Sequence, residues 1–408
     1  MKFRKYQIEI INKAFDVLVK YGFVYLSMQV RTGKTLTAMG IAQKLGVDNM
    51  LFVTKKKAIS SIEDDYKKLK PNFHLNVVNY ESLHKVTGNY DSLVLDEAHG
   101  LGAYPKPSKR AKMIKEVITK QKPFVILMSG TPTPESFSQM YHQVYACPHN
   151  PFRAYKSFYK FAKVYVNVVL KKIGSMPHND YTQGKQTILD AMKPYMISYT
   201  QKEAGFQAEI EEKVLKVKMS ELTYNMVKQL KKNLVIEGKD EVVLADTSVK
   251  LMMKLHQLFS GTVKFESGKG QVIDFSKAEF IRNEFAHMKV GIFYKFKAEY
   301  DALKSVYGDD LTTELDEFDS TNKSIALQIV SGREGISLRK ANCLVYYNID
   351  FSALSYWQSR DRMTTKDTVK NDVYWIFAEG GIEDKIYKAV TKKKDYTLKH
   401  FEKDLLSL

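Results

Sequence analysis

The sequence predicts an α/β fold built on parallel sheets, because short apolar runs and helical stretches alternate through most of the chain. Parallel strands need a crossover between them, usually a helix, and such helices cover both faces of the sheet. The chain has 408 residues, of which 44% are hydrophobic and 27% charged. This length and composition are typical of a soluble protein with two or three domains, each with its own core.

The first part of the chain predicts one such sheet. Residues 5–20 carry apolar side chains at helical spacing and predict an amphipathic helix. A further helix is expected at 59–69, and apolar runs predict strands at 23–26, 50–53, 75–78, 93–95 and 124–128. The carboxyl ends of parallel strands meet at one edge of a sheet, so we expect the functional residues there.

The pattern changes at about residue 146, and we predict an α-helical insertion over 146–212. It comprises a long helical segment at 151–170, a polar loop at 174–180 and a helix near 185–195. A strand at 214–217, two helices and a hairpin over 262–275 follow. A second α/β series is expected at 276–286, 290–293, 297–306, 326–330, 343–347 and 373–377, with a helical tail from 382. The predicted domains are 1–145, 146–212 and 213–408.

The formal net charge of +17 favours a polyanionic partner such as nucleic acid. Each Lys or Arg that meets a phosphate releases condensed counterions, which favours binding. A lysine-rich solvated surface is the alternative. The same two interpretations apply to the helically spaced Arg153, Lys156, Lys160 and Lys163, which alternate with aromatic residues.

Several classes of protein are disfavoured. No run of about 18 apolar residues occurs, so no membrane span is expected. The first residues lack the apolar stretch of a secretory signal. Cys147 and Cys343 are the only cysteines and are far apart, which supports neither a disulfide framework nor a cysteine metal site. We therefore expect a protein of the reducing cytoplasm.

Residues 23–38 predict a phosphate-binding loop. An apolar strand leads through a tight turn into Gly33-Lys34-Thr35, which opens a helical pattern. Backbone N–H groups at the start of a helix converge on an anion. Lys34 would add a charge near the terminal phosphates, and the Thr35 hydroxyl would ligate Mg²⁺. Met28 stands where the usual pattern has its first glycine.

Asp96 and Glu97 form the second chemical motif, directly after the apolar run 93–95. Two adjacent carboxylates at the end of a buried strand are costly unless they hold something positive. Asp96 is placed to hold Mg²⁺ through water, and Glu97 to orient and deprotonate an attacking water. An acid pair that merely caps the strand is the alternative.

These two motifs and their surroundings resemble the superfamily 2 helicases and translocases. Asp96-Glu97-Ala98-His99 matches their DEAH block, and further blocks occur in the order typical of that superfamily. The matching blocks are 3–7 (Q-type), 53–56 (Ia), 79–83 (Ib), 129–132 (III), 292–296 (IV), 335–338 (V) and Gln358 with Arg362 (VI). Residues 79–83, 129–134 and 381–387 are similar to the Swi/Snf-like branch. The whole chain resembles its compact bacteriophage or bacterial DNA helicases.

The resemblance implies two tandem RecA-like P-loop NTPase lobes, with an α-helical insertion after motif III and ATP bound between the lobes. The implied catalytic residues are Lys34, Asp96, Glu97, Arg362 and Arg360. The implied ATP-binding residues are Arg4, Gln7 (to adenine), Arg31, Thr32, Gly33, Lys34, Thr35 and Gly335, with Thr35 and Asp96 on Mg²⁺. The implied nucleic-acid contacts are Thr54, Lys55, Lys56, Tyr80, Ser82, Tyr294 and Ser331. The implied coupling residues are His99, Ser129, Thr131 and Gln358.

Two positions depart from the pattern of the branch. Motif VI usually carries two arginines three residues apart, but Thr365 stands at the second position when Arg362 is aligned with the first. Arg360 or Arg362 would then reach the nucleotide, or the arginine finger is absent. Residues 196–199 read Met-Ile-Ser-Tyr where the branch usually has paired arginines.

The sequence thus predicts an ATP-dependent DNA helicase or translocase, a nucleic-acid-stimulated ATPase that moves along duplex or branched DNA without reading its sequence. The resemblance favours DNA over RNA, and we expect a monomer in a prokaryotic or phage-infected cytoplasm. There are two alternatives: an RNA helicase, and a nucleic-acid-binding module with a weak or vestigial ATPase.

Overall fold

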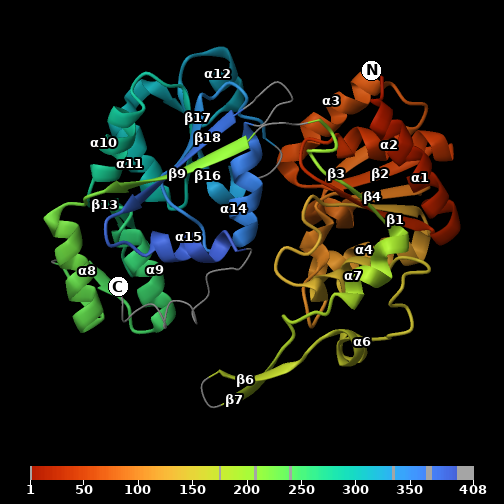
Figure 1. Ribbon diagram of the computed structural model, residues 1–408, viewed down its shortest axis with the longest axis horizontal. Helices are drawn as coiled ribbons and strands as arrows, with labels where there is room; N and C mark the ends of the chain where they lie inside the picture. Colours follow the sequence, from red (N-terminus) through yellow and green to blue (C-terminus); the bar gives the residue numbers. More distant parts are fainter. Residues whose placement is uncertain are drawn as a thin grey trace. The chain divides into compact units, whose positions relative to one another are not determined.

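The computed structural model describes residues 2–173, 176–205, 209–238, 241–332, 336–363 and 370–392. The chain divides into two compact units, Met1–Gly205 (unit 1) and Phe206–Leu408 (unit 2), and each contains a six-stranded sheet (Figure 1). The strands of both sheets pair in parallel, which confirms the predicted α/β fold class. None of the described helices is long and apolar enough to cross a membrane.

Unit 1 has the strand order β3-β2-β4-β5-β1-β8. The strands are β1 (Phe23–Met28), β2 (Asn49–Thr54), β3 (His74–Asn79), β4 (Ser92–Leu95), β5 (Phe124–Met128) and β8 (Met196–Tyr199). The helices are α1 (Lys5–Tyr21), α2 (Lys34–Leu45), α3 (Ile59–Leu69), α4 (Lys109–Gln121), α5 (Met140–Val144), α6 (Phe158–Tyr165) and α7 (Thr187–Met192). The predicted strands of the first part of the chain are therefore confirmed.

Helices cover both faces of this sheet. Successive side chains of a strand point to opposite faces, and β1 follows this rule. Val24 and Leu26 pack in one core with residues of α1, α2 and α3. Phe23 and Tyr25 pack in the other with residues of α4 to α7. Since both layers exclude water from β1, its carboxyl end at Met28 is held in a fixed position for the loop that follows.

Unit 2 has the strand order β15-β16-β14-β17-β18-β9. These strands are β9 (Glu209–Val217), β14 (Val290–Tyr294), β15 (Leu311–Thr312), β16 (Ser324–Gln328), β17 (Cys343–Tyr346) and β18 (Lys370–Ala378). Its helices are α8 (Glu221–Asn233), α9 (Ser248–Leu258), α10 (Ser276–Glu284), α11 (Lys297–Tyr307), α12 (Leu315–Ser320), α13 (Ile329–Gly332), α14 (Ala353–Ser359) and α15 (Glu383–Val390). The predicted hairpin is confirmed as β12 (Thr262–Lys264) with β13 (Gly270–Val272), and a second hairpin pairs β10 (Val235–Glu237) with β11 (Val242–Leu244).

Short 3₁₀ helices connect these elements. They are η1 (Lys56–Ala58), η2 (Tyr80–Lys85), η3 (Ala98–Leu101), η4 (Phe137–Gln139), η5 (Lys193–Tyr195), η6 (Gly308–Asp310) and η7 (Arg360–Arg362). Three of them, η1, η2 and η3, directly follow the carboxyl ends of strands in unit 1 and carry predicted site residues.

The predicted long helix over 151–170 is wrong. Helix α6 starts only after Ser157, whose side chain caps it by accepting a hydrogen bond from the Lys160 N–H. The helix ends at Tyr165, and the β-branched valines at 166, 168 and 169 then favour extended backbone. Strands β6 (Val169–Ile173) and β7 (Met176–Asp180) accordingly form an antiparallel hairpin that projects from unit 1 (Figure 1). Strand β7 occupies the predicted polar loop.

The region 146–212 also does not form a separate compact body. Strand β8 pairs with β1, with Leu26 opposite Ile197, and so completes the sheet of unit 1. Strand β9, only ten residues further on, belongs to the sheet of unit 2. The chain therefore divides into two compact units between Gly205 and Phe206, and not at the predicted boundaries 145 and 212.

Candidate active site

The phosphate loop of unit 1 runs from the end of β1 to the start of α2. Two of its residues have left-handed backbone conformations, Arg31 with φ 63° and Gly33 with φ 79°. A Cβ atom at Gly33 would lie 2.6 Å from Nε2 of Gln7, so the position requires glycine for its space as well as for its backbone. The Gly33-Lys34-Thr35 motif therefore forms the tight turn that the sequence predicts.

Residues of the Q-type motif hold the carboxyl-terminal end of this loop, next to the start of α2. The Tyr6 hydroxyl donates to the carbonyl of Thr32 (2.9 Å), and the Gln7 amide donates to the carbonyl of Gly33 (3.2 Å). The N–H and C=O of one peptide group point in opposite directions. Because the carbonyls of Thr32 and Gly33 are bonded to α1, we expect the N–H groups that follow them to face the concave side of the loop, where an anion would bind.

The side chain of Gln7 is buried, with an exposed fraction of 3%, and both of its polar atoms have partners. Its Oε1 accepts from the backbone N–H of Arg4 (2.9 Å), and its Nε2 donates to Gly33. The Arg4 guanidinium donates to the Tyr6 hydroxyl (3.2 Å). Gln7 thus positions the loop in this structure, and its contact with adenine stays a prediction.

The segment after β8 holds the other side of the loop. Tyr199 accepts a hydrogen bond from the Gln29 N–H at its carbonyl (2.9 Å), and its ring stacks on Tyr6 with centroids 4.7 Å apart. The Gln201 amide donates to the carbonyl of Val30 (3.1 Å), and its backbone N–H donates to Oε1 of Gln29 (2.7 Å). The sequence reasoning missed these residues, because they lie some 170 positions from the loop and follow no local motif.

Lys34 lies between the phosphate loop and the segment after β5. Its ammonium donates to the carbonyl of Met28 (3.0 Å). A Cβ built on Gly130 would be 3.5 Å from this nitrogen, so the two groups are in close proximity. The loops after β1 and β5 therefore meet at the carboxyl edge of the sheet, as predicted.

Asp96 follows β4 at the same edge and is held by three neighbours. Its Oδ2 accepts from the Thr54 hydroxyl (2.8 Å), and its Oδ1 accepts from the Glu97 N–H (3.0 Å). The Tyr80 hydroxyl donates to its main-chain carbonyl (2.6 Å). Burial and, to a smaller extent, the charge of Glu97 raise the pKa of this carboxyl, while Lys34 and the Thr54 hydroxyl lower it, and the net value is about 6. A buried anion of this kind gains stability from a bound cation.

Glu97 is linked to the residues predicted to couple the site. Its backbone is left-handed, with φ 50°, and its Oε2 lies 3.3 Å from Nδ1 of His99. The same Nδ1 is 2.9 Å from the Ser129 hydroxyl, which in turn accepts from the Thr131 N–H (3.1 Å). His99 and Ser129 are both buried. A continuous polar chain therefore connects the acid pair to the loop after β5.

In unit 2, Arg360 is anchored by a carboxylate of β9. Its Nη1 lies 2.5 Å from Oε1 of Glu212, and its guanidinium lies 4.0 Å above the ring of Trp357. Glu212 also accepts from three further donors, namely the Tyr356 and Tyr387 hydroxyls and the Trp375 indole N–H. Arg360 thus joins η7 to the sheet of unit 2.

Arg362 is buried, with an exposed fraction of 7%. Its Nη1 donates to the carbonyl of Ile336 (3.3 Å), and its own carbonyl accepts from the Leu338 N–H (2.9 Å). The predicted motif VI arginine therefore contacts the predicted motif V segment. Both candidate finger arginines are engaged within unit 2 in this structure.

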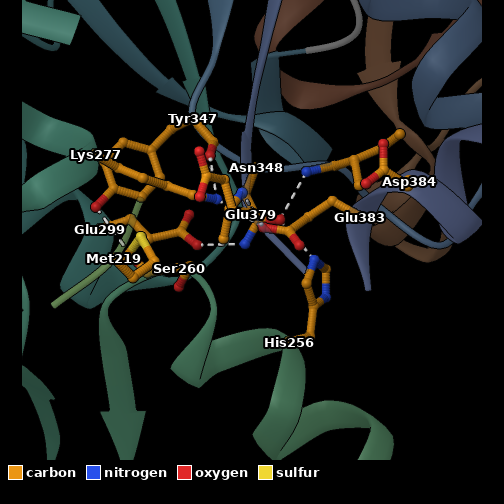
Figure 2. Close-up of polar contacts among 12 residues, drawn as sticks. Met219, His256, Ser260, Lys277, Glu299, Tyr347, Asn348, Glu379, Glu383 and Asp384 are labelled. Carbon is orange, nitrogen blue, oxygen red and sulfur yellow. Dashed lines mark hydrogen bonds and ion pairs between the residues drawn. The ribbon is translucent and has the colours of Figure 1, made fainter. Parts of the chain in front are cut away.

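A buried polar network supports the predicted motif IV (Figure 2). Oε2 of Glu299 accepts from the backbone N–H groups of Lys295 and Phe296, directly after β14 (2.7 and 3.0 Å). Its Oε1 accepts from Asn348 (2.6 Å), whose Oδ1 accepts from His256 (2.5 Å). Burial raises the pKa of Glu299 and lowers that of His256 well below its usual value. The imidazole is therefore neutral, and the network fixes the turn that follows β14.

The sequence profile of the SNF2-related domain matches residues 41–262, more than half of the chain. This protein belongs to the SNF2-related domain family. Two similar solved structures come from Sulfolobus solfataricus. The SWI2/SNF2 ATPase core in complex with dsDNA is 15% identical, with coverage of 100% of this chain and 93% of that chain and a TM-score of 0.42. The SWI2/SNF2 ATPase core domain is 16% identical, with coverage of 96% and 89% and a TM-score of 0.44. No curated protein matches the chain.

The structure of this SNF2-related protein brings most predicted residues of unit 1 to one edge. Thr35 is in the first turn of α2, next to Lys34, and Arg31 and Thr32 lie in the loop. Of the predicted nucleic-acid contacts, Thr54 and Tyr80 are buried against Asp96, so their side chains are not accessible. The remaining ones in unit 1 are Lys55, Lys56 and Ser82, of which Lys56 is exposed and the other two are half-buried.

In unit 2 of this SNF2-related protein, Tyr294 ends β14 and is half-buried. Ser331 lies in α13 and Gln358 in α14, but their side chains are outside the described part of the chain. Gly335 and Thr365 also lie outside the described residues. The roles implied for these four positions stay predictions.

Proposed function

We propose that this SNF2-related protein is a nucleic-acid-stimulated ATPase that couples ATP hydrolysis to movement along duplex or branched DNA. The observation that carries the proposal is the convergence of Lys34, Asp96 and Glu97 beside a phosphate loop whose carbonyls are tied back to the scaffold. The family match and the net charge of +17 support DNA as the partner.

The donor set suits Mg²⁺ with a triphosphate. Carboxylate and hydroxyl oxygens are the ligands that this cation prefers, and Asp96 with the Thr35 hydroxyl would hold it, directly or through water. The buried Asp96 carboxylate, with its raised pKa, would be stabilised by the cation. When bound, Mg²⁺ neutralises phosphate charge.

The chain's own residues then act in defined roles. The ammonium of Lys34, now on the carbonyl of Met28, would turn to the terminal phosphates. Glu97 would accept the proton of the attacking water. Nδ1 of His99 contacts both the Glu97 carboxylate and the Ser129 hydroxyl, so a change at the nucleotide would be transmitted to the loop after β5. One of the two motif VI arginines would supply the finger.

The test is ATP hydrolysis by the full chain with duplex DNA, single-stranded DNA and RNA. Lys34→Ala should abolish hydrolysis while binding of duplex DNA without nucleotide is retained. Lys44→Ala, near the other end of α2 and exposed, is the matched control and should hydrolyse ATP normally. Stimulation by RNA alone would favour an RNA helicase. Hydrolysis at background with every nucleic acid would leave only a nucleic-acid-binding module.

A further inference from the structure

A basic depression of about 410 Å³ opens on unit 1, away from the phosphate loop. It is lined by three basic residues (Lys20, His149 and Arg153), by two tyrosines (Tyr21 and Tyr195), and by Asn150 and Pro151. No carboxylate is among the residues that line it. We call this depression the basic basin.

The basic basin lies at the amino-terminal edge of the sheet. Tyr21 ends α1 just before β1 begins at Phe23, and Tyr195 directly precedes β8, the neighbour of β1. The phosphate loop leaves the other end of β1, at Met28. Five residue steps of about 3.3 Å place roughly 17 Å between the two ends. The basic basin is therefore separate from the candidate active site.

The turn that presents the basic side chains is rigidly built. His149 has a left-handed backbone, with φ 51°, a conformation that histidine adopts more readily than most residues other than glycine. Asn150 is buried and fixes the turn, because its amide donates to the carbonyl of Cys147 and its Oδ1 accepts from the Phe152 N–H, both at 2.9 Å. Pro148 packs closely on Gly22: a Cβ atom added to Gly22 would lie only 2.6 Å from Cγ of Pro148.

The basic side chains of the basin lie close together. Nη1 of Arg153 donates a hydrogen bond to Nδ1 of His149 (2.9 Å), which orients the guanidinium. Burial raises the pKa of the Tyr195 hydroxyl, whereas the charges of Arg153 and Lys20 both lower it, so both charges act on that hydroxyl. Within the described part of the chain, neither Lys20 nor Arg153 forms an ion pair with a carboxylate.

We propose that the basic basin binds a phosphate group of a nucleic-acid backbone, at the sheet edge opposite the nucleotide loop. A guanidinium is suited to phosphate through paired N–H donors, and a lysine adds a point charge. The basin is open and larger than one phosphate, and the Tyr21 and Tyr195 rings, which pack on each other with centroids 4.4 Å apart, form an aromatic wall. Positively charged grooves that follow a nucleic-acid backbone also carry aromatic side chains. The choice of a nucleic acid as the source of the phosphate rests on the proposed function.

The phosphate site itself is tested without DNA, by NMR of the full chain with ¹³C-labelled histidine. The chain has nine histidines, and His149→Gln identifies the resonance of interest. Titration with inorganic phosphate should shift the His149 resonance saturably, and Arg153→Ala should abolish this shift. The other histidine resonances report whether the variant is folded. A His149 resonance that does not respond in the unmodified protein would overturn the phosphate site.

The nucleic-acid source is tested by the salt dependence of duplex DNA binding. Each lost phosphate contact lowers the slope of log K against log salt by about 0.9. Since the basin holds one phosphate, Lys20→Ala with Arg153→Ala should lower it by about 0.9. Lys13→Ala with Lys120→Ala removes two exposed charges of α1 and α4 and should leave the slope unchanged. Equal slopes for the two double variants would overturn the backbone assignment. The ATPase assay tests the proposed function separately, since neither double variant alters the phosphate loop.

Discussion

Replacing Asp96 by asparagine should stabilise unit 1 in the absence of nucleotide and divalent cations. The structure buries this carboxylate beside Glu97, which raises its pKa from the ordinary value of 3.8 to about 6. A carboxyl with a raised pKa in the folded state opposes folding wherever it is ionised. An asparagine of the same shape carries no charge, so the variant removes this penalty.

The magnitude follows from the pKa shift and the lost hydrogen bond. A shift of this size corresponds to about 3 kcal/mol, at 1.36 kcal/mol per unit. Asparagine keeps one carbonyl oxygen, so it accepts from Thr54 or from the Glu97 N–H but not from both. The lost hydrogen bond reduces this gain in stability by about 1 kcal/mol. The net gain of about 2 kcal/mol should raise the melting temperature of unit 1 by about 4 to 8 °C.

The gain should depend on pH in a defined direction. The penalty is complete above the folded-state pKa of about 6 and disappears as the pH falls toward the unfolded-state value of 3.8. Asp96→Asn should therefore stabilise at pH 8 and have little effect near pH 4. Calorimetry in the presence of EDTA measures the stability of the variant and of the unmodified chain at each pH. Trp357 and Trp375 are the only tryptophans and lie in unit 2, so tryptophan fluorescence should show an unchanged second transition.

Asp64→Asn is the matched control, because Asp64 is exposed and is paired with Lys67 only at 3.9 Å. Its effect should stay within about 0.5 kcal/mol. An Asp96→Asn protein that melts at or below the temperature of the unmodified chain at pH 8 would refute the reasoning. So would a gain of equal size at pH 8 and pH 4.

The remaining predictions concern catalysis and positioning. Glu97→Gln should bind ATP normally but lower its turnover by at least about 100-fold, as single-turnover kinetics would show; near-normal turnover would remove Glu97 as the base. Gln201→Ala loses one hydrogen bond to the loop, so the dissociation constant of ATP should rise about fivefold, with Lys202→Ala unchanged as control. Arg360→Ala should destabilise unit 2 by about 3 kcal/mol in tryptophan-monitored unfolding, because it leaves Glu212 without its ion-pair partner. Arg362→Ala should instead slow turnover by about 10³ with stability less affected, if Arg362 is the finger; a reversed pattern would exchange the two roles.

Local patterns were enough to predict the centre of the site. The apolar run of β1, the turn at Gly33-Lys34-Thr35 and the acid pair after β4 are each recognisable within a few residues. The rule that parallel strands end at one edge then brings Lys34 and Asp96 together, and the structure confirms it. Sequence order and sheet topology were thus sufficient for this part.

Other features depend on contacts between distant parts of the chain and have no local signal. Gln201 bonds the phosphate loop across 171 positions, and Arg360 pairs with Glu212 across 148. Thr54 and Tyr80 look like exposed polar residues at strand ends, yet both support Asp96 because that buried carboxylate and its backbone need donors. The apolar spacing around the valines that follow α6 predicts a helix, but their β-branched side chains favour the observed β6–β7 hairpin.

Displacement of a third strand from triplex DNA tests the central claim most directly, since it reports ATP-driven movement along a duplex without strand separation. The unmodified chain should displace the third strand only with ATP and Mg²⁺. Glu97→Gln, which retains the fold and the nucleotide site, should displace none. Displacement that is equal with and without ATP, or ATP hydrolysis on duplex DNA with no displacement at all, would contradict a translocase.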